Sequence, residues 1–567
     1  MERYIKGIDR NQITMETRSL DEKIEKENPI RVIDAFVEKL DIKKLGFKRS
    51  ETKKVGSKGY NPKDLMKLYL YCYQKGIRSS RKIARMCKIN LEVRWLLREI
   101  EPDFRTIADF RKENIESFRK VFVEFNIICK QMNLISGKVS QDGVKIKAVN
   151  SKDRNYTLSK LDDRIKRLEE KVNQYIKELD EADKEEEREE EIDVKEILKR
   201  LENYKGIREE IEKEGKSQVS LTDKESKLMK NNGKYDVAYN TQVAVDVGSH
   251  IVSGYEVSDD PADIGKINEM GEKIQKELGL EIITDVTDKG YNDRKDMMKS
   301  LENGIIPQVT PQEEEDEVEL ETEYEEAKIS DEEKKSKKKE AIKKCLRAGK
   351  IPEVYKDVIK EIKIEERKEV ELSGKTEEKS YPQGELKDYA MENNCFVRDI
   401  ETGRVYCPMG EILRKKSKHK GGERYCNKLA CKNCKRPCTK ARYKEVTFQE
   451  GQVTVGEKNK KRKHRGKRVV KKKVIIKLKV DKQLLTLRMG TSEHPHGTMK
   501  RNDNFDYFLL KGKKKVSGEL GIYYCSSNIR RAVNMMGVEK LLEEIERYGE
   551  NKETGSHFFL LKIRPSH

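Results

Sequence analysis

Three acidic residues have neighbours that suit metal chemistry. Asp142 precedes Gly143 in SQDGVKIKA, where apolar residues alternate with lysines as in a half-buried strand. Asp288 follows the apolar run EIITDVT, where a strand would end, and Glu493 lies in TSEHPHGTMKR at a predicted helix start. Carboxylates from separate elements can hold two divalent ions, which activate the attacking oxygen and stabilise the leaving oxygen in displacement at phosphorus. Oxygen ligands and phosphate substrates favour Mg²⁺, with Mn²⁺ as a possible substitute.

A second set of candidate ligands is a cluster of cysteines. The chain has eleven cysteines, and five of them fall between Cys407 and Cys438. Thiolates spaced as in Cys431-x-x-Cys434-x-x-x-Cys438 suit tetrahedral Zn²⁺, with a fourth ligand from Cys407 or Cys426. We favour Cys407, because Cys-Pro-x-Gly resembles one knuckle of a zinc ribbon. A structural zinc is expected here, and unligated thiols are the alternative. Some cysteines are scattered singly and the others form one cluster. This pattern is typical of a protein in a reducing cytosol with one metal site.

The charge of the chain points to a polyanionic partner. Charged residues make up 40% of the 567 residues and the formal net charge is +19, which favours nucleic acid first and an anionic membrane surface second. The most basic stretch, residues 456–480, would neutralise several phosphates, or serve as a solvated linker. No run of about 18 apolar residues and no secretory signal are found, so we expect a bacterial cytoplasmic, nucleoid-associated protein without a membrane span.

Residues 1–135 are predicted to form helices. Ser79 or Ser80 is a plausible cap for one helix, and Thr106 for a long helix that continues to Phe125. Arg78 and Arg81, followed by Lys82 and Arg85, give a basic segment that resembles a helix-turn-helix DNA reader. A helical bundle with solvated arginines fits the same residues equally well.

The rest of the chain predicts an α/β core with insertions. Strand 139–149, a hairpin over 234–257, and strands near 281–287 and 304–309 alternate with helices. Heptad-like spacing over residues 158–218, around an acidic middle, predicts a coiled-coil insertion, with a charged spacer as the alternative. Residues 310–380 lose the apolar pattern and are expected to be flexible or extended. The expected regions are 1–135, 136–310, 311–480 and 481–567.

Four motifs in this order carry a family resemblance: DGVKIKA, YNTQVAVD, TDKGY and SEHPHGTMKR. Together with GIRSSRKIARMC and EPDFRTIADFR near the N-terminus, they resemble DDE transposases of bacterial insertion sequences, over about residues 30 to 545. The resemblance implies an RNase H-like core, cut-and-paste or related transposition of double-stranded DNA with Mg²⁺, and a cysteine cluster. It places the family's acidic triad on Asp142, Asp288 and Glu493, with Lys500 as the lysine after the glutamate. Asp285 is the fallback for Asp288 but lacks the adjacent Gly-Tyr.

The sequence departs from this family at three points. QLLTLR lacks the usual tyrosine, Arg488 is separated from Glu493 by four residues where three is typical, and His496 stands where Phe is usual. Arg488 and Lys500 are still expected to contact DNA. Asn240 and Gln242 in YNTQ are expected to contact DNA or to support the carboxylates, or else to be structural hydrogen bonders.

The sequence favours one function and leaves two alternatives. The first is a transposase that binds terminal inverted repeats, cuts DNA and joins the ends to target DNA, as a homodimer because two ends must be paired. The second is a DNA-binding regulator with an inactive core, and the third a nuclease without strand transfer.

Overall fold

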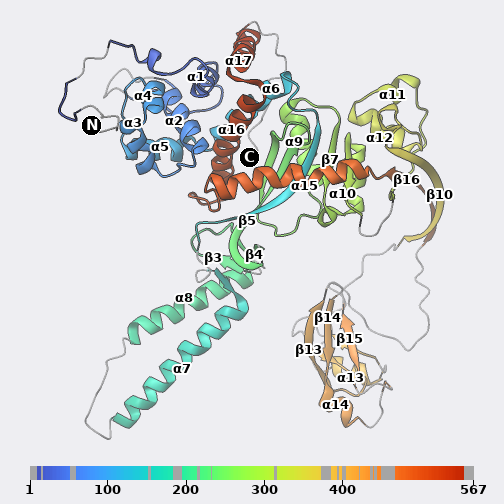
Figure 1. Cartoon of the computed structure of the whole chain (residues 1–567). Coiled ribbons are helices and arrows are strands. Elements are labelled where there is room, and N and C mark those ends of the chain that lie inside the picture. The colour runs from blue at the N-terminus through green and yellow to red at the C-terminus, as the bar shows by residue number, and fades with distance from the viewer. Residues whose placement is uncertain are drawn as a thin grey trace, which may run out of the picture. The chain divides into compact units, whose positions relative to one another are not determined.

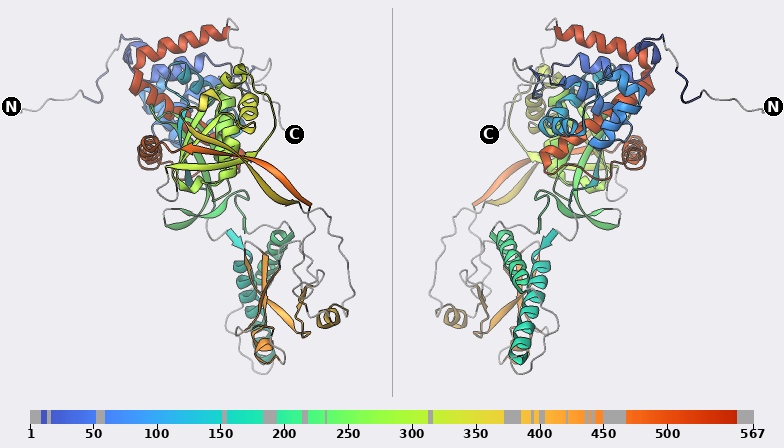
Figure 2. Two further views of the ribbon diagram at one scale, coloured as in Figure 1. Left: turned by 90° about the vertical axis from the view of Figure 1, so that its right-hand side faces the viewer. Right: turned by 90° about the vertical axis from the view of Figure 1, so that its left-hand side faces the viewer.

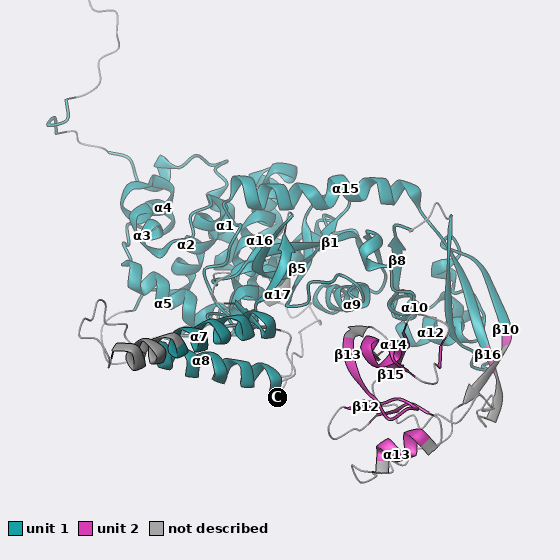
Figure 3. Ribbon diagram, turned by 90° about the horizontal axis from the view of Figure 1, so that it is seen from below, with its two compact units in different colours: residues 1–365, 473–567 teal, residues 366–472 magenta. Residues whose placement is uncertain are grey.

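The computed structural model divides the chain into two compact units (Figures 1 and 3). One comprises residues 1–365 and 473–567, and the other residues 366–472. The described residues are 9–13, 17–51, 59–150, 155–182, 194–213, 218–231, 233–311, 316–371, 385–392, 395–398, 404–419, 422–434, 438–439, 443–448 and 467–553. None of the helices in these ranges is long and apolar enough to cross a membrane.

Six helices form the N-terminal part of the larger unit: α1 (Ile30–Glu38), α2 (Pro62–Gln74), α3 (Ser80–Ile89), α4 (Leu91–Leu96), α5 (Phe104–Asn114) and α6 (Ser117–Gln131). The prediction of one long helix capped by Thr106 was wrong. Asp103 caps α5, its carboxylate accepting from the Arg105 and Thr106 amides, and the helix breaks before α6. Eight residues of a continuous helix rise about 12 Å. The break instead lets Phe110 and Phe118 meet edge-to-face, with ring centroids 6.0 Å apart.

A six-stranded sheet forms the centre of the larger unit. Its path is β4 (Lys227–Asn231), β5 (Lys234–Asp246), β1 (Lys138–Lys147), β7 (Ile283–Thr287) and β8 (Ile305–Val309), and β6 (Val252–Ser258) also pairs with β5. Strands β1, β7 and β8 are mutually parallel, whereas β5 is antiparallel to both β1 and β6. The α/β core and the β5–β6 hairpin predicted from the sequence are confirmed.

Helices cover both faces of this sheet. On one face, α9 (Ile267–Leu278) packs so closely that a Cβ at Gly271 would lie 2.5 Å from the Ile305 side chain. Helix α10 (Arg294–Glu302) connects β7 to β8. Helix α15 (Lys482–Gly497) crosses the sheet in front (Figure 1). Since side chains alternate along a strand, the β1 residues that face α15 alternate with residues on the opposite face of the sheet.

The C-terminal helices join the N-terminal helices in one apolar core. Helix α16 (Lys513–Met536) packs against α6 and α2, and α17 (Val538–Glu553) against α1 (Figure 2). Glu519 on α16 is fully buried, accepts from the Leu509 and Leu510 amides, and lies 3.5 Å from the Arg78 guanidinium. Residues 1–135 therefore do not form a unit of their own.

Two helices form a hairpin within residues 158–218, where the sequence predicts a coiled-coil insertion. Helix α7 (Leu158–Ala182) packs against α8 (Val194–Lys213), with ion pairs Arg208–Asp162 at 2.7 Å and Lys205–Glu169 at 2.8 Å. Of the two pairs, the one that lies further along α7 lies earlier along α8, so the helices are antiparallel. Strands β2 (Asn155–Thr157) and β3 (Gln218–Ser220) close the base of the hairpin.

The charged segment after β8, for which the sequence predicts a flexible or extended stretch, forms both helices and paired strands in its described residues 316–371. It forms β9 (Glu317–Glu323), α11 (Asp331–Lys335), α12 (Lys339–Arg347) and β10 (Ile359–Glu371), and β16 (Lys467–Lys479) lies between β10 and β9. Val318 and Leu320 are buried, while the lysines of β16 lie beside the glutamates of β9, as in Lys477–Glu319 at 3.4 Å. Cross-strand pairs of opposite charge stabilise a strand that looks too polar by composition.

The smaller unit is a five-stranded antiparallel sheet in the order β11 (Val397–Arg398), β12 (Val405–Tyr406), β13 (Ile412–His419), β14 (Gly422–Cys426) and β15 (Glu445–Phe448). Helices α13 (Glu385–Glu392) and α14 (Lys428–Lys432) accompany it. Its described residues include two small apolar clusters, one of Val405, Leu413, Tyr425 and Phe448 and one of Leu386, Ala390, Cys395, Val397 and Tyr406. Residues 456–466 of the predicted basic arm lie outside the described residues.

Candidate active site

Asp142 lies on β1, and Asp288 directly follows the neighbouring parallel strand β7. Strand β1 pairs with β7 through Val139–Asp285 and Ser140–Val286, and the same register continued by two residues sets Asp142 opposite Asp288. Asp288 follows the last residue of β7 and caps the short helix η3 (Lys289–Tyr291), its Oδ1 accepting from the Gly290 amide at 2.8 Å. The carboxyl ends of parallel strands are where ligands collect in α/β sheets.

The Asp142 carboxyl is in an environment that disfavours its charge. Burial raises its pKa to about 6, and the neighbouring Asp288 and Asp263 carboxylates add to this effect. The Gly143 amide, which donates to Asp142 Oδ1 at 2.8 Å, and the nearby Arg488 act in the opposite direction. Arg488 thus lies on α15 within electrostatic reach of Asp142. A bound cation would favour the ionised carboxyl.

This shift gives a pH dependence for the metal-free protein. The folded pKa of about 6 lies above the ordinary 3.8, so ionisation of Asp142 lowers the free energy of unfolding. This loss of stability is absent below about pH 4 and grows as the pH rises through 6. Asp142→Asn is therefore expected to stabilise the metal-free protein at pH 7 by about 1–3 kcal/mol. The gain should vanish near pH 4. Thermal unfolding with a chelator measures it, and a gain independent of pH would contradict this description of Asp142.

Asp285 points to the other face of β7 and is fully buried. Neither of its carboxylate oxygens has a hydrogen-bond partner among the described residues. Burial raises its pKa well above the ordinary value, with a further contribution from Asp296. A neutral, enclosed carboxyl is poorly suited to bind a cation, so the structure favours Asp288 over the fallback Asp285.

A network of amides lies behind Gly143, on the face that α9 covers. Asn240 and Gln242 donate to Asp263 Oδ1 at 2.7 and 2.6 Å, and the Tyr291 hydroxyl donates to Gln242 Oε1. Asn240 and Gln242 are almost wholly buried. These contacts favour the structural hydrogen bonding that the sequence left open for both residues, rather than contact with DNA.

Gly143 is required by this network. A Cβ at position 143 would lie 2.4 Å from Asp263 Oδ1 and 3.0 Å from Gln242 Nε2. The missing side chain lets the Asp263 carboxylate approach the strand directly beside Asp142. Sequence reasoning missed Asp263, because nothing in DDPADIG distinguishes it from Asp259 and Asp260.

Glu493 is not brought to the two aspartates. It is exposed on α15 and makes no hydrogen bond or ion pair among the described residues, while Thr491 and Ser492 are buried. Across these residues, no group of three or more His, Cys, Asp or Glu side chains is placed to hold a metal ion. Of the predicted triad, the structure juxtaposes Asp142 and Asp288.

Lys500 lies near the site, in the π-helical turn η5 (Thr498–Asn502) that follows α15. Burial lowers its pKa; nearby Lys147 and Lys145 act in the same direction, and Asp506 and Asp142 act against it. His496 is enclosed, and neither of its nitrogens has a hydrogen-bond partner in the part of the chain that the structure describes; burial next to Lys500 lowers its pKa to about 3. The His496 imidazole is therefore neutral.

The two arginines predicted to read DNA differ in their surroundings. Arg78 is buried between the Phe505 and Tyr507 rings, and its guanidinium donates to the Tyr507 carbonyl at 2.7 Å. This differs from the prediction of a DNA contact, because the guanidinium is engaged inside the protein. Arg81 on α3 is exposed, with its guanidinium 5.4 Å from the centre of the Phe104 ring.

Cys407 begins a tight turn in the smaller unit. The Gly410 amide donates to the Cys407 carbonyl at 2.8 Å, and the Met409 amide lies 3.4 Å from its sulfur. Burial raises the pKa of the Cys407 thiol, and nearby Cys434 and Cys438 add to this. Cys426 is on β14 opposite Glu445. Cys407 is therefore electrostatically linked to two of the three cysteines in the predicted set.

Residues 18–113 match a family model described as a transposase domain (DUF772). The match supports a transposase family. It ends within α5, so it includes Arg78 and Arg81 but none of the three acidic residues. Neither a curated protein nor a solved structure matches the chain.

Proposed function

We propose that the chain is a DDE transposase with an RNase H-like core. The observation that carries this is the juxtaposition of Asp142 and Asp288 at the end of a mixed sheet, in a chain with a transposase-domain match. An antiparallel hairpin beside parallel strands joined by helices is the arrangement expected of such a core. The alternating residues of SQDGVKIKA and the strand end at TDKGY supply its two aspartates.

The donor set suits Mg²⁺ in part. Asp142 and Asp288 supply hard oxygen ligands, and the raised pKa of Asp142 is what a site without its cation would show. The two bound ions would activate a water molecule and then a 3′-hydroxyl for attack at phosphorus. The proposal requires Glu493 to turn toward the aspartates when metal and DNA bind.

Cations around the pair would hold the DNA. Arg488 and Lys500 lie near Asp142 from two consecutive elements, so both can face a phosphate at the site. The Gly143 amide donates to Asp142 Oδ1, and Asp263, which accepts from Gln242, lies beside Gly143. Pairing of two transposon ends would need two copies of the chain, and a homodimer is therefore part of the proposal.

The cysteines of the smaller unit are proposed to hold a structural zinc. Soft thiolates suit Zn²⁺, and the proposed ligands are Cys407, Cys431, Cys434 and Cys438. The turn at Cys407 directs the Met409 amide toward the sulfur, which would stabilise a bound thiolate. A metal would also reinforce a unit with small apolar clusters.

The exposure of Glu493 favours a second candidate, a DNA-binding regulator with an inactive core. One assay separates the functions. The purified protein is incubated with Mg²⁺ or Mn²⁺, labelled duplexes carrying the inverted repeats that flank the gene, and target DNA. A transposase is expected to cut the ends and join the 3′-hydroxyls to the target. Binding without nicking in either metal would indicate the regulator, and nicking without joining a nuclease.

A further inference from the structure

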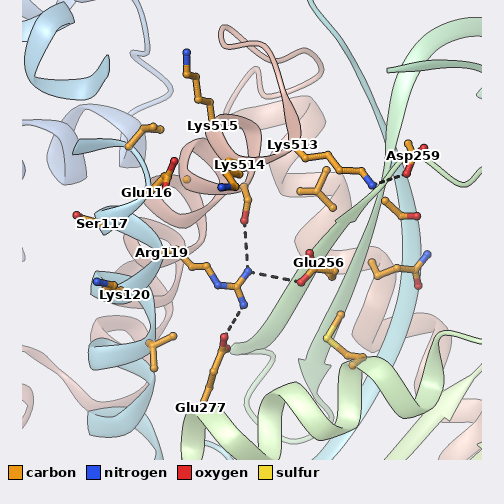
Figure 4. Close-up of a pocket in the computed structure, with 18 of the residues that line it drawn as sticks. Glu116, Ser117, Arg119, Lys120, Glu256, Asp259, Glu277, Lys513, Lys514 and Lys515 are labelled. Atoms are coloured by element: carbon orange, nitrogen blue, oxygen red, sulfur yellow. Dashed lines mark hydrogen bonds and ion pairs between the residues drawn. The ribbon is translucent and has the colours of Figure 1, made fainter. Parts of the chain in front are cut away.

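A cleft of about 1260 Å³ lies between α6, β6, α9 and the start of α16 (Figure 4). Arg119 reaches into it from α6 and forms ion pairs with Glu277 at 2.5 Å and Glu256 at 3.8 Å. Asp259 is held by Lys513 at 2.5 Å and by Lys227 at 2.8 Å. These contacts neutralise much of the acidic lining.

Among the described lining residues, the lysines without an ion pair outnumber the carboxylates without one. Among the described residues, four exposed lysines of the lining form no ion pair: Lys48, Lys112, Lys514 and Lys515. In the described part of the chain, the lining carboxylates without an ion pair are Glu116 and Asp260, since Glu113 pairs with Arg49 and Glu269 with Lys266. The four lysines come from three separated parts of the chain. The cleft therefore has unneutralised positive charge distributed along its walls.

The start of α16 is unusual in its charge. Lys513, Lys514 and Lys515 occupy the first turn of this 24-residue helix, which has no acidic residue there. The helix dipole favours anions at an N-terminus, so three lysines in that turn oppose each other and the dipole. Local arrangements that lower the stability of the fold are typical of functional sites, where a bound ligand can offset the unfavourable charge. Here the compensating group would be an anion in the cleft.

We propose that this cleft binds the phosphate backbone of duplex DNA through Lys48, Lys112, Lys514 and Lys515. Lys48 and Lys112 lie in the segment that matches the transposase domain. Gln242 lines the cleft and also donates to Asp263, which lies behind Gly143. The cleft thus leads from the matched domain to the network beside Asp142. The inference rests on the proposed function and adds a DNA-holding surface distinct from Arg488 and Lys500.

The salt dependence of binding tests this surface. The probe is a fluorescein-labelled duplex of arbitrary sequence, about 30 base pairs or three turns long, because phosphate contacts do not read sequence. Each phosphate contact contributes about 0.9 to the slope of log K against log salt. In K514A/K515A the magnitude of the slope is expected to fall by about twice the contribution of one contact. Fluorescence anisotropy measures binding at each salt concentration. Thermal unfolding of the variant checks that these exposed changes leave the fold intact.

A matched control is available in the same unit. Lys337 and Lys338 are also adjacent, exposed and at the start of a helix, α12, but do not line the cleft. K337A/K338A is expected to keep the wild-type slope. An unchanged slope in K514A/K515A, with normal binding by the wild type, would overturn the inference and leave the proposed function standing. Equal losses in both variants would also overturn it. Failure of the wild type to bind any duplex would instead refute the proposed function.

Discussion

Replacing Gly518 with alanine is expected to lower the free energy of unfolding by about 3 kcal/mol or more. A Cβ at this position of α16 would lie 1.9 Å from the Ile115 carbonyl oxygen and 2.6 Å from its carbon. These are backbone atoms, so no side-chain rotation relieves the clash. Helix α16 would have to move away from the segment that joins α5 to α6. The midpoint of urea unfolding, followed by the fluorescence of Trp95, the one tryptophan, measures the loss.

Gly206 on α8 provides the control. No atom lies within 4 Å of a Cβ built there, so Gly206→Ala should be neutral or stabilise its helix by up to about 1 kcal/mol. Wild-type stability in Gly518→Ala would contradict the backbone contact between α16 and the segment joining α5 to α6. That contact sets the C-terminal helices against the N-terminal ones.

Asp142→Asn is expected to reduce metal-dependent DNA cleavage by roughly 10³-fold or more while DNA binding is retained. Asparagine keeps the size of the side chain but removes the charge that a divalent ion requires. Cleavage of labelled end duplexes in Mg²⁺ measures the rate, and anisotropy with the same duplexes measures binding. Glu493→Gln should show the same loss if Glu493 joins the site when DNA binds.

The two variants also distinguish an active site from a structural one. Cleavage that persists in Asp142→Asn at the wild-type rate would contradict the assignment of the site. Cleavage lost in Asp142→Asn but normal in Glu493→Gln would place the third acidic ligand elsewhere.

Local patterns in the sequence were sufficient to predict the strand that holds Asp142 and the strand end at Asp288. Apolar alternation and the Gly-Tyr context are both visible without a structure. The opposition of these two residues depends on the register of β1 with β7, which joins segments more than 140 residues apart in the sequence (288 − 142 = 146). No local pattern encodes that register.

Other features were hidden because they depend on partners far along the chain. Arg78 reads as a surface cation until Phe505, Tyr507 and Glu519 enclose it. The strand Glu317–Glu323 has the composition of a disordered acidic segment. It is stabilised by pairing with β16, whose lysines lie beside its glutamates. In both cases the compensating group lies more than 100 residues away.

The number of Mn²⁺ ions bound by variants at positions 288 and 285 tests the central claim, that Asp142 and Asp288 form the metal-binding pair. Electron paramagnetic resonance counts the bound ions on the protein–DNA complex. Asp285→Asn is the matched control, because Asp285 is buried and its raised pKa favours a neutral carboxyl that asparagine resembles. We expect Asp285→Asn to bind Mn²⁺ as the wild type does and Asp288→Asn to lose it. Retained binding in Asp288→Asn with loss in Asp285→Asn would contradict the assignment.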